Sequence, residues 1–181
     1  MKRARTILFA LVAVIGFSFG NANAQSFAAS NTNTRSIDEQ IYRRLKGADQ
    51  TIFDHITWQV NGSTVTLSGK AYSLGIVSRA KALVKDIPGI TEVVNNIEQL
   101  PPSPMDDRIR QAAVIEIQRR GPSQYFGYPN PDVHIIVENG RITLEGYVAR
   151  KSDSDVINIL ANGISGVFQV TNNLVVGKRE F

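Results

Sequence analysis

The chain has 181 residues, no cysteine, 20 lysine and arginine residues against 16 aspartate and glutamate residues, and a formal net charge of +4. Without cysteine the protein has no disulfide and a structural zinc site is not expected, so an apolar core must stabilise the fold. Three of the basic residues lie within the first five positions. The rest of the chain is nearly neutral and lacks the concentrated basic surface typical of a nucleic-acid-binding protein.

The first element in chain order is a predicted secretory signal peptide over residues 1–24. A basic start is followed by an apolar run over residues 6–20, and Ala22 and Ala24 form an Ala-x-Ala cleavage site. The run is too short to cross a bilayer comfortably, which takes about 20 apolar residues. We therefore expect cleavage after Ala24, export to the periplasm without a transmembrane span, and a flexible segment over residues 25–35.

The remaining sequence contains an internal repeat. The segments Thr64–Gly69 and Arg141–Gly146 both alternate apolar and polar residues and end on glycine. A second pair of segments, Pro88–Ile97 and Ser165–Leu174, shares a glycine, a valine and an asparagine at matching places. Both pairs are 77 positions apart, and one offset across two separate motifs indicates a duplicated module. The predicted boundaries are a first domain at 36–100, a linker at 101–104, a second domain at 105–176 and a C-terminal tail at 177–181.

Each copy is predicted to begin with an amphipathic helix. Asp38 and Asp106 lie in the first turns, where a carboxylate complements the helix dipole. Apolar residues then recur at helical spacing: Ile37, Ile41 and Leu45 in the first copy, and Ile109, Ala113 and Ile117 in the second.

A β-hairpin is expected next in each copy. Its strands are predicted at 55–60 and 64–72 in the first copy and at 133–138 and 141–148 in the second. Asn139-Gly140 is typical of a two-residue type I′ turn, in which both residues have a positive φ. The first copy has Ser63 in addition to Asn61-Gly62, so we expect its loop to be one residue longer.

A second helix and a last strand complete each copy. The apolar stripes of these helices are Ile76, Ala80, Leu83, Val84 and Ile87 in the first copy, and Ile157, Leu160, Ala161 and Ile164 in the second. A glycine turn, at Gly89 or Gly166, leads into the last strand, which should run parallel to the middle strand. The predicted fold is α+β: two tandem α-β-β-α-β modules, each a small three-stranded mixed sheet with two helices.

Gly69 and Gly146 lie on the core-facing side of their strands. Because glycine weakens a strand unless another group approaches closely, we expect a helix to pack against bare backbone at both positions. Gly69, Gly89, Gly146 and Gly166 are therefore assigned structural rather than catalytic roles.

These motifs resemble the BON domain family. Its pattern is an acidic residue and isoleucine at the start of a helix, a hairpin ending in Val-x-Leu-x-Gly, and a closing Gly-Val-x-x-Val-x-Asn-x-Leu/Ile. The matching residues are Asp38, Ile41, Val65, Leu67, Gly69, Gly89, Ile90, Val93, Asn95 and Ile97 in the first copy, and Asp106, Ile109, Ile142, Leu144, Gly146, Gly166, Val167, Val170, Asn172 and Leu174 in the second. The resemblance implies a periplasmic or envelope-associated protein that binds phospholipid surfaces or supports envelope integrity under stress. The family pattern contains no catalytic residues.

No constellation typical of an active site occurs in the sequence. His55 and His134 lie at the starts of the two hairpins without the spacing of metal ligands. Neither a Gly-x-Ser-x-Gly elbow nor a glycine-rich phosphate loop is present. We therefore predict a protein that is not an enzyme and that has no cofactor, no metal site and no nucleic-acid partner.

The connection that follows the first helix of the second copy is the strongest candidate for binding. It places Arg119 and Arg120 beside Tyr125, Phe126 and Tyr128 in a Pro/Gly-rich loop that exceeds the matching loop of the first copy. Aromatic rings favour the bilayer interface and arginine attracts anionic headgroups, so this loop is a candidate for contact with lipid. Alternatively, the rings fold back over the core or fill the gap between the domains.

A second candidate is the pair Val156 and Ile159, which lies off the core-facing stripe of its helix. The first copy has Arg79 and Ala82 at these positions. We expect the pair to pack between the two domains, the alternative being a contact with lipid or protein. Trp58, the only tryptophan, is expected to be half-buried in its sheet.

The function expected from these features is that of a periplasmic, non-enzymatic protein. Its partners would be anionic phospholipid surfaces or envelope proteins, and its role would be envelope integrity or stress tolerance. The alternative is a soluble periplasmic chaperone or scaffold that binds exported polypeptides.

Overall fold

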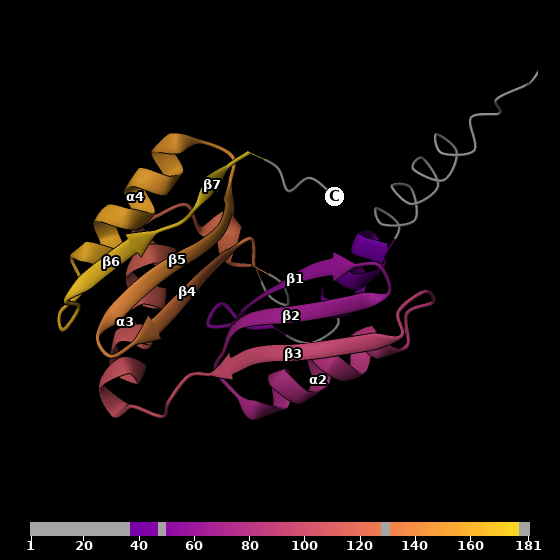
Figure 1. The fold of residues 1–181 in the computed structure, drawn as a ribbon. Helices are drawn as coiled ribbons and strands as arrows, with labels where there is room; N and C mark the ends of the chain where they lie inside the picture. The colour runs from indigo at the N-terminus through magenta and orange to yellow at the C-terminus, as the bar shows by residue number, and fades with distance from the viewer. Residues whose placement is uncertain (1–36, 47–49, 128–130, 178–181) are drawn as a thin grey trace, which may run out of the picture.

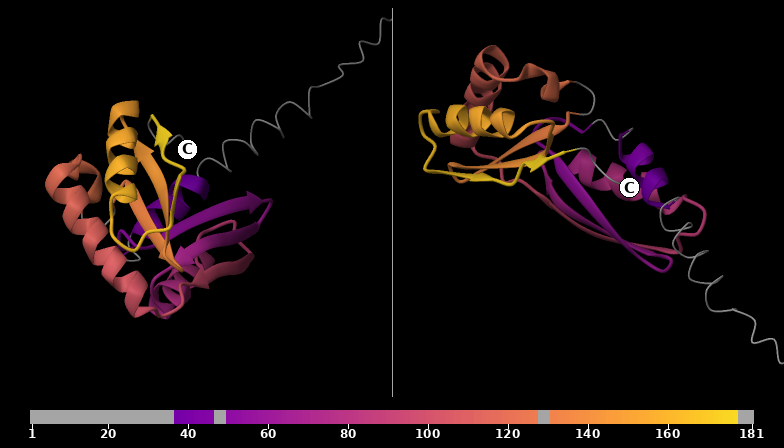
Figure 2. Two further views of the ribbon diagram at one scale, coloured as in Figure 1. Left: turned by 90° about the vertical axis from the view of Figure 1, so that its left-hand side faces the viewer. Right: turned by 90° about the horizontal axis from the view of Figure 1, so that it is seen from above.

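The computed structural model describes residues 37–46, 50–127 and 131–177. Two modules follow one another along the chain, and each is a small sheet with its helices on one face (Figure 1, Figure 2). The fold is thus α+β with two tandem modules, as the sequence predicts. The predicted signal peptide over 1–24 and the segment over 25–35 lie outside the described residues.

The first module has a mixed sheet of three strands. Its elements are a helix over residues 37–46, β1 (His55–Asn61), β2 (Thr64–Ala71), α2 (Leu74–Lys85) and β3 (Glu92–Gln99). The middle strand, β2, is antiparallel to β1 and parallel to β3. The connection from β2 to β3 passes through α2, which makes the parallel pairing possible.

The second module repeats this plan with two additions. Its elements are α3 (Pro104–Arg120), the 3-10 helix η1 (Ser123–Phe126), β4 (Val133–Glu138), β5 (Arg141–Val148), α4 (Lys151–Asn162), β6 (Gln169–Asn172) and β7 (Val175–Val176). The middle strand, β5, is antiparallel to β4 and parallel to both β6 and β7. The last strand is therefore split in two, and at the break the Leu174 N–H donates a hydrogen bond to the Asn172 side chain.

The two hairpin turns are equal in length, which corrects the longer loop expected in the first copy. The strand pairing leaves Gly62 and Ser63 between β1 and β2, and Asn139 and Gly140 between β4 and β5. The 77-position offset continues through the hairpin, so our alignment of the two Asn-Gly pairs was wrong by one residue. Asn139 and Gly140 both have a positive φ, of 52° and 70°, as a type I′ turn requires.

Each module has its own apolar core, built by the stripes that helical spacing predicts. In the first module the helices contribute Ile37, Ile41, Leu45, Ala80 and Val84, and the turn after α2 contributes Ile87. In the second module the helices contribute Ile109, Ala113, Ile117, Ile157 and Ala161, and the turn after α4 contributes Ile164. Trp58 is half-buried as expected, and its indole Nε1 donates a 2.9 Å hydrogen bond to Oδ1 of Asp38.

Gly69 and Gly146 lie tight against the neighbouring strand rather than against a helix. A Cβ at Gly69 would lie 2.0 Å from the carbonyl oxygen of His55, and a Cβ at Gly146 would lie 2.0 Å from that of Asp132. Their φ values, 123° and 112°, lie in a region that side chains rarely adopt. The expected close approach is present, but the expected helix contact is wrong because the hairpin partner already occupies that space.

The other two structural glycines occupy equivalent turns in the two modules. A Cβ at Gly89 would lie 3.5 Å from the side chain of Ile37, and one at Gly166 would lie 3.7 Å from that of Ile109. Each turn before the last strand thus packs against the first helix of its own module.

The two modules meet along β4, an edge strand of the second sheet. The backbone N–H of Ile135 donates a 2.6 Å hydrogen bond to the carbonyl of Ile52, in the segment before β1. On the same strand the carbonyl of Val137 accepts a 2.5 Å hydrogen bond from the buried guanidinium of Arg110. Unpaired strand edges invite pairing with other chains, so these bonds satisfy the edge within the molecule.

Candidate binding surfaces

The aromatic residues of the long connection in the second module are part of its core. Tyr125 and Phe126 lie in η1, are 8% and 6% exposed, and belong to the apolar cluster of this module. The expected contact of these two rings with lipid is therefore wrong, and the alternative, that they fold back over the core, is correct. They fill the space where η1 packs against α3 and β4. Tyr128, the third aromatic residue, lies outside the described residues.

The phenol of Tyr125 has a specific structural role. It donates a 2.6 Å hydrogen bond to Oδ2 of Asp153 and accepts a 2.9 Å hydrogen bond from the backbone N–H of Ala149. The hydrogen bond from Tyr125 lowers the pKa of the Asp153 carboxyl group, and the nearby Arg150 acts in the same direction while burial opposes both. The connection is thereby fastened to the first turn of α4.

Four of the predicted binding residues are exposed on two neighbouring helices. Arg119 and Arg120 end α3, and Val156 and Ile159 lie on α4 with 39% and 68% of their surface exposed. The expected packing of Val156 and Ile159 between the domains is therefore wrong. The helix that carries them lies on the side of the second module away from the first (Figure 1).

Exposed aliphatic side chains occur on both of these neighbouring helices. Ile115 of α3 is also 51% exposed, and we refer to Ile115, Arg119, Arg120, Val156 and Ile159 as the α3–α4 surface. The two helices pack against each other. A Cβ at Gly121 would lie 3.1 Å from the Leu160 side chain, so the arginine-bearing end of α3 adjoins the turn of α4 that carries Ile159.

The charges on α3 and α4 balance, because the two helices carry five basic and five acidic residues. Arg120 pairs with Glu116 at 3.0 Å, and Lys151 pairs with Asp155. No ion pair of Arg119 or Arg108 occurs within the described parts of the chain. The α3–α4 surface therefore combines exposed aliphatic side chains with Arg119, which has no ion pair among the described residues, and Arg120, which is paired with Glu116.

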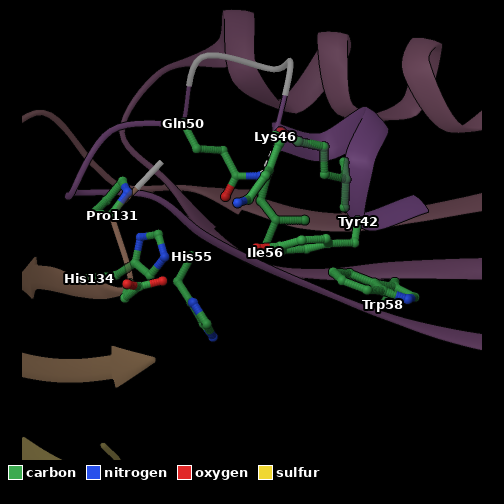
Figure 3. Close-up of a pocket in the computed structure, with 10 residues that line it drawn as sticks. Tyr42, Lys46, Gln50, His55, Ile56, Trp58, Pro131 and His134 are labelled. Carbon is green, nitrogen blue, oxygen red and sulfur yellow. Dashed lines mark hydrogen bonds between the residues drawn. The ribbon is translucent and has the colours of Figure 1, made fainter. Parts of the chain in front are cut away.

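A second candidate region lies between the modules, where a small polar pocket separates β1 from β4. His55 of β1 and His134 of β4 lie side by side there, with ring centroids 5.1 Å apart (Figure 3). The amide of Gln50 donates a 3.2 Å hydrogen bond to the Leu45 carbonyl at its rim. The pocket has a volume of about 30 Å³, which is room for no more than a few waters, so it is too small for an organic ligand.

Two larger clefts flank this junction, with volumes of about 400 Å³ and about 330 Å³. His55 and Glu145 border both, and Nε2 of His55 lies 3.9 Å from Oε2 of Glu145. In the smaller cleft Lys70 bridges Glu98 at 2.5 Å and Glu138 at 3.3 Å. The hydrogen bond with Glu98 is the main cause of the raised pKa of Lys70.

Sequence reasoning assigned no binding role to the residues of these clefts, although it named Trp58, Gly69 and Gly146 for other reasons. The cleft residues come mainly from β1, β2, β4 and β5, with Asp38 from the helix over residues 37–46 and Val175 from β7, and they are brought together by the placement of one module against the other. The sole hint was that the two histidines begin equivalent hairpins. Within the described ranges, no three His, Asp or Glu side chains are grouped so as to hold a metal ion.

No helix among the residues that the structure describes is long and apolar enough to cross a membrane. This finding does not extend to residues 1–36, where the predicted signal peptide lies.

Comparison with known proteins identifies the repeat. The family model of the BON domain matches twice, over residues 33–101 and 117–178. No curated protein matches the chain. Two solved structures of CdsD, a structural protein of the type III secretion system of Chlamydia trachomatis, are similar at 14% and 13% identity.

One of these structures, of the C-terminal domain, covers 77% of this chain and 96% of its own, and the other covers 80% and 94%. Both have a TM-score of 0.31, which is too low to support an inference about this chain.

Proposed function

Because the chain belongs to the BON domain family, with two copies of the domain along its length, we propose that it is a periplasmic, non-enzymatic protein that binds anionic phospholipid surfaces. BON domains are generally found in periplasmic or membrane-associated proteins. The predicted signal peptide favours the same compartment. The proposed contact is the α3–α4 surface, and the proposed role is in envelope integrity or stress tolerance.

The observation that carries this proposal is the exposure of aliphatic side chains on adjacent helices. Ile159, Ile115 and Val156 are 68%, 51% and 39% exposed. An aliphatic side chain that moves from water into an apolar environment contributes about 1.5–3 kcal/mol when it is fully buried. Partial insertion of these residues at the headgroup boundary would supply an attraction that salt does not screen.

The arginines at the end of α3 supply the preference for anionic lipid. Each basic residue near an anionic surface contributes about 1 kcal/mol, and this attraction decays with distance over about one Debye length. Arg119 and Arg120 lie beside the turn of α4 that carries Ile159. A local basic and aliphatic surface would account for lipid binding by a chain whose overall charge, without residues 1–24, is close to neutral.

The repeat provides an internal comparison. At the positions of Val156 and Ile159, the first module has Arg79 and Ala82. The first module therefore keeps the core-facing stripe of this helix but not the exposed aliphatic pair. A fold with this architecture does not require that pair, which supports a role for it in binding.

Co-sedimentation with liposomes tests the proposal. The double variant Val156→Ser with Ile159→Ser should lower affinity for anionic liposomes at least about tenfold at both low and high salt. Arg119→Gln with Arg120→Gln should weaken binding mainly at low salt. Leu74→Ser, which removes a 63% exposed leucine from the first module, is the matched control and should bind as the parent does.

Equal binding by the parent and the Val156/Ile159 double variant, with both folded, would overturn the proposal. Suppression of aggregation of an unfolded polypeptide by a parent protein that ignores liposomes would favour the chaperone alternative instead.

A further inference from the structure

The larger cleft between the modules, with its volume of about 400 Å³, is separate from the α3–α4 surface. It lies between β1 of the first module and β5 of the second, with the helix over residues 37–46 at one side. Small-molecule sites commonly occupy 300–1,000 Å³ and occur preferentially at domain interfaces. The cleft therefore has the size and the position of a ligand site.

The charged groups in this cleft are acidic. Asp38 lies at its first-module side and Glu145 at its second-module side. No lysine or arginine occurs among the described residues that line it. His55 is the one basic side chain among the described residues that line the cleft, and its Nε2 lies 3.9 Å from Oε2 of Glu145.

Each of the two carboxylates accepts a hydrogen bond from a neutral side chain. Oδ1 of Asp38 accepts the indole N–H of Trp58, and Oε1 of Glu145 accepts a 2.8 Å hydrogen bond from the side chain of Asn173. These bonds fix the orientation of the carboxylates without neutralising their charge. A site ordered in advance in this way loses little entropy when a ligand binds.

Two aromatic side chains add a second attraction for positive charge. Trp58 and Tyr147 line the same cleft from opposite modules. Indole and phenol faces attract ammonium and guanidinium groups through the ring quadrupole. The side chain of Val175, which is 51% exposed, offers aliphatic surface for an apolar stem.

The repeat indicates that the fold does not require Trp58, Glu145 or Tyr147, whereas Asp38 has a counterpart in Asp106. At the 77-position offset, Trp58 corresponds to Ile135, Glu145 to Ser68 and Tyr147 to Lys70. The core stripes are present in both copies, whereas these cleft positions differ in chemistry. A role in binding accounts for the difference better than a role in folding.

From the two oriented carboxylates and two aromatic side chains in this cleft, we propose that it binds a primary ammonium group on an aliphatic stem. The source is a free aliphatic amine or the side chain of a lysine residue in a polypeptide. Both have the same cationic group and the same stem, so they are separated by experiment.

Titration followed by the fluorescence of Trp58, the only tryptophan of the chain, tests this proposal directly. The probes are Nα-acetyl-lysine amide, cadaverine and the uncharged Nα-acetyl-norleucine amide, at constant ionic strength, with calorimetry as a second readout. The lysine amide or cadaverine should bind saturably, and about tenfold or more tightly than the norleucine amide. Tighter binding of the lysine amide identifies a polypeptide side chain as the source, and tighter binding of cadaverine identifies a free amine.

Glu145→Gln keeps the shape of the side chain and should weaken binding of the cationic probe about tenfold. Glu138→Gln, in the neighbouring cleft, is the matched control and should leave binding unchanged. Tyr147→Leu is a second variant with an expected loss, in case Glu145→Gln does not fold. Equal affinity for the cationic and uncharged probes, absence of saturable binding, or parent-like binding by both folded variants would overturn the proposal. Liposome binding should be unaffected by these variants.

Discussion

Tyr125 and Asp153 are joined by a 2.6 Å hydrogen bond across 28 positions of the chain. The bond connects η1, in the long connection of the second module, to the first turn of α4. It gives Tyr125 a structural role in a connection that is longer than the matching connection of the first module. Tyr125 holds the longer connection in place, because its ring is buried in the core and its hydroxyl donates a hydrogen bond to the Asp153 carboxylate.

Replacing Tyr125 by phenylalanine should destabilise the protein in a pH-dependent manner. The hydrogen bond from Tyr125 lowers the folded-state pKa of Asp153. A carboxyl group with a lowered pKa stabilises the fold above its unfolded pKa and loses this contribution as the pH falls through the folded pKa. In Tyr125→Phe the pKa of Asp153 returns towards its ordinary value. The difference in thermal midpoint between parent and variant should therefore shrink between about pH 7 and about pH 2.

The control for this measurement is Tyr72→Phe. Tyr72 is 43% exposed, and its hydroxyl donates a 3.1 Å hydrogen bond to Asp107, so its loss should have a smaller effect on the midpoint. A Tyr125→Phe midpoint difference that stays constant over the whole pH range would contradict the assigned role of Asp153.

Substitution of Gly146 by alanine should destabilise the second module strongly. The added Cβ would meet the Asp132 carbonyl oxygen at 2.0 Å, and the φ of 112° is unfavourable for any side chain. The backbone must shift, at a cost of about 2 kcal/mol or more. Urea unfolding checks this, with Gly62→Ala as the control, because Gly62 has a positive φ but no atom within 4 Å of its added Cβ. Equal unfolding midpoints for the two variants would show that the close contact with the Asp132 carbonyl does not determine the loss of stability.

Asp106 does more than complement the dipole of α3. It is 1% exposed, and its carboxylate accepts hydrogen bonds of 3.0 Å and 2.8 Å from the backbone N–H groups of Asn139 and Gly140. Asp106→Ala leaves these donors of the hairpin turn without an acceptor and should cost about 1–3 kcal/mol in urea unfolding. Asp106→Asn keeps one acceptor oxygen, so its stability should lie between that of the parent and that of Asp106→Ala. Parent-like stability of Asp106→Ala would rule out this link between helix and turn.

The helices and strands were predictable because their patterns are local. Ile109 and Ile157 recur at helical spacing with their neighbours, and helix geometry alone places such residues on one face. The length of the first turn was mispredicted because Asn61-Gly62 looks like a turn pair, whereas strand pairing continues through Asn61. Only the register of the whole hairpin distinguishes the two alternatives.

The sites were predictable only in part. Ile159 is off the core-facing stripe, so its exposure follows from its position once no other domain covers it. Phe126 has no periodic context, and whether its ring faces lipid or core depends on how η1 packs against α3 and β4. The cleft that joins Trp58 to Glu145 depends on the relative placement of two modules, which no local pattern encodes.

The most direct test of lipid binding by the α3–α4 surface is a site-specific fluorescent label. The chain has no cysteine, so Ile159→Cys gives one attachment point for an environment-sensitive fluorophore, and Leu74→Cys in the first module gives a matched reference. On addition of anionic liposomes that carry an acyl-chain quencher, the label at position 159 should shift to shorter wavelength and be quenched, while the label at position 74 should not change. Quenching at position 74 alone, or at neither position while the protein co-sediments with the liposomes, would contradict the proposed contact.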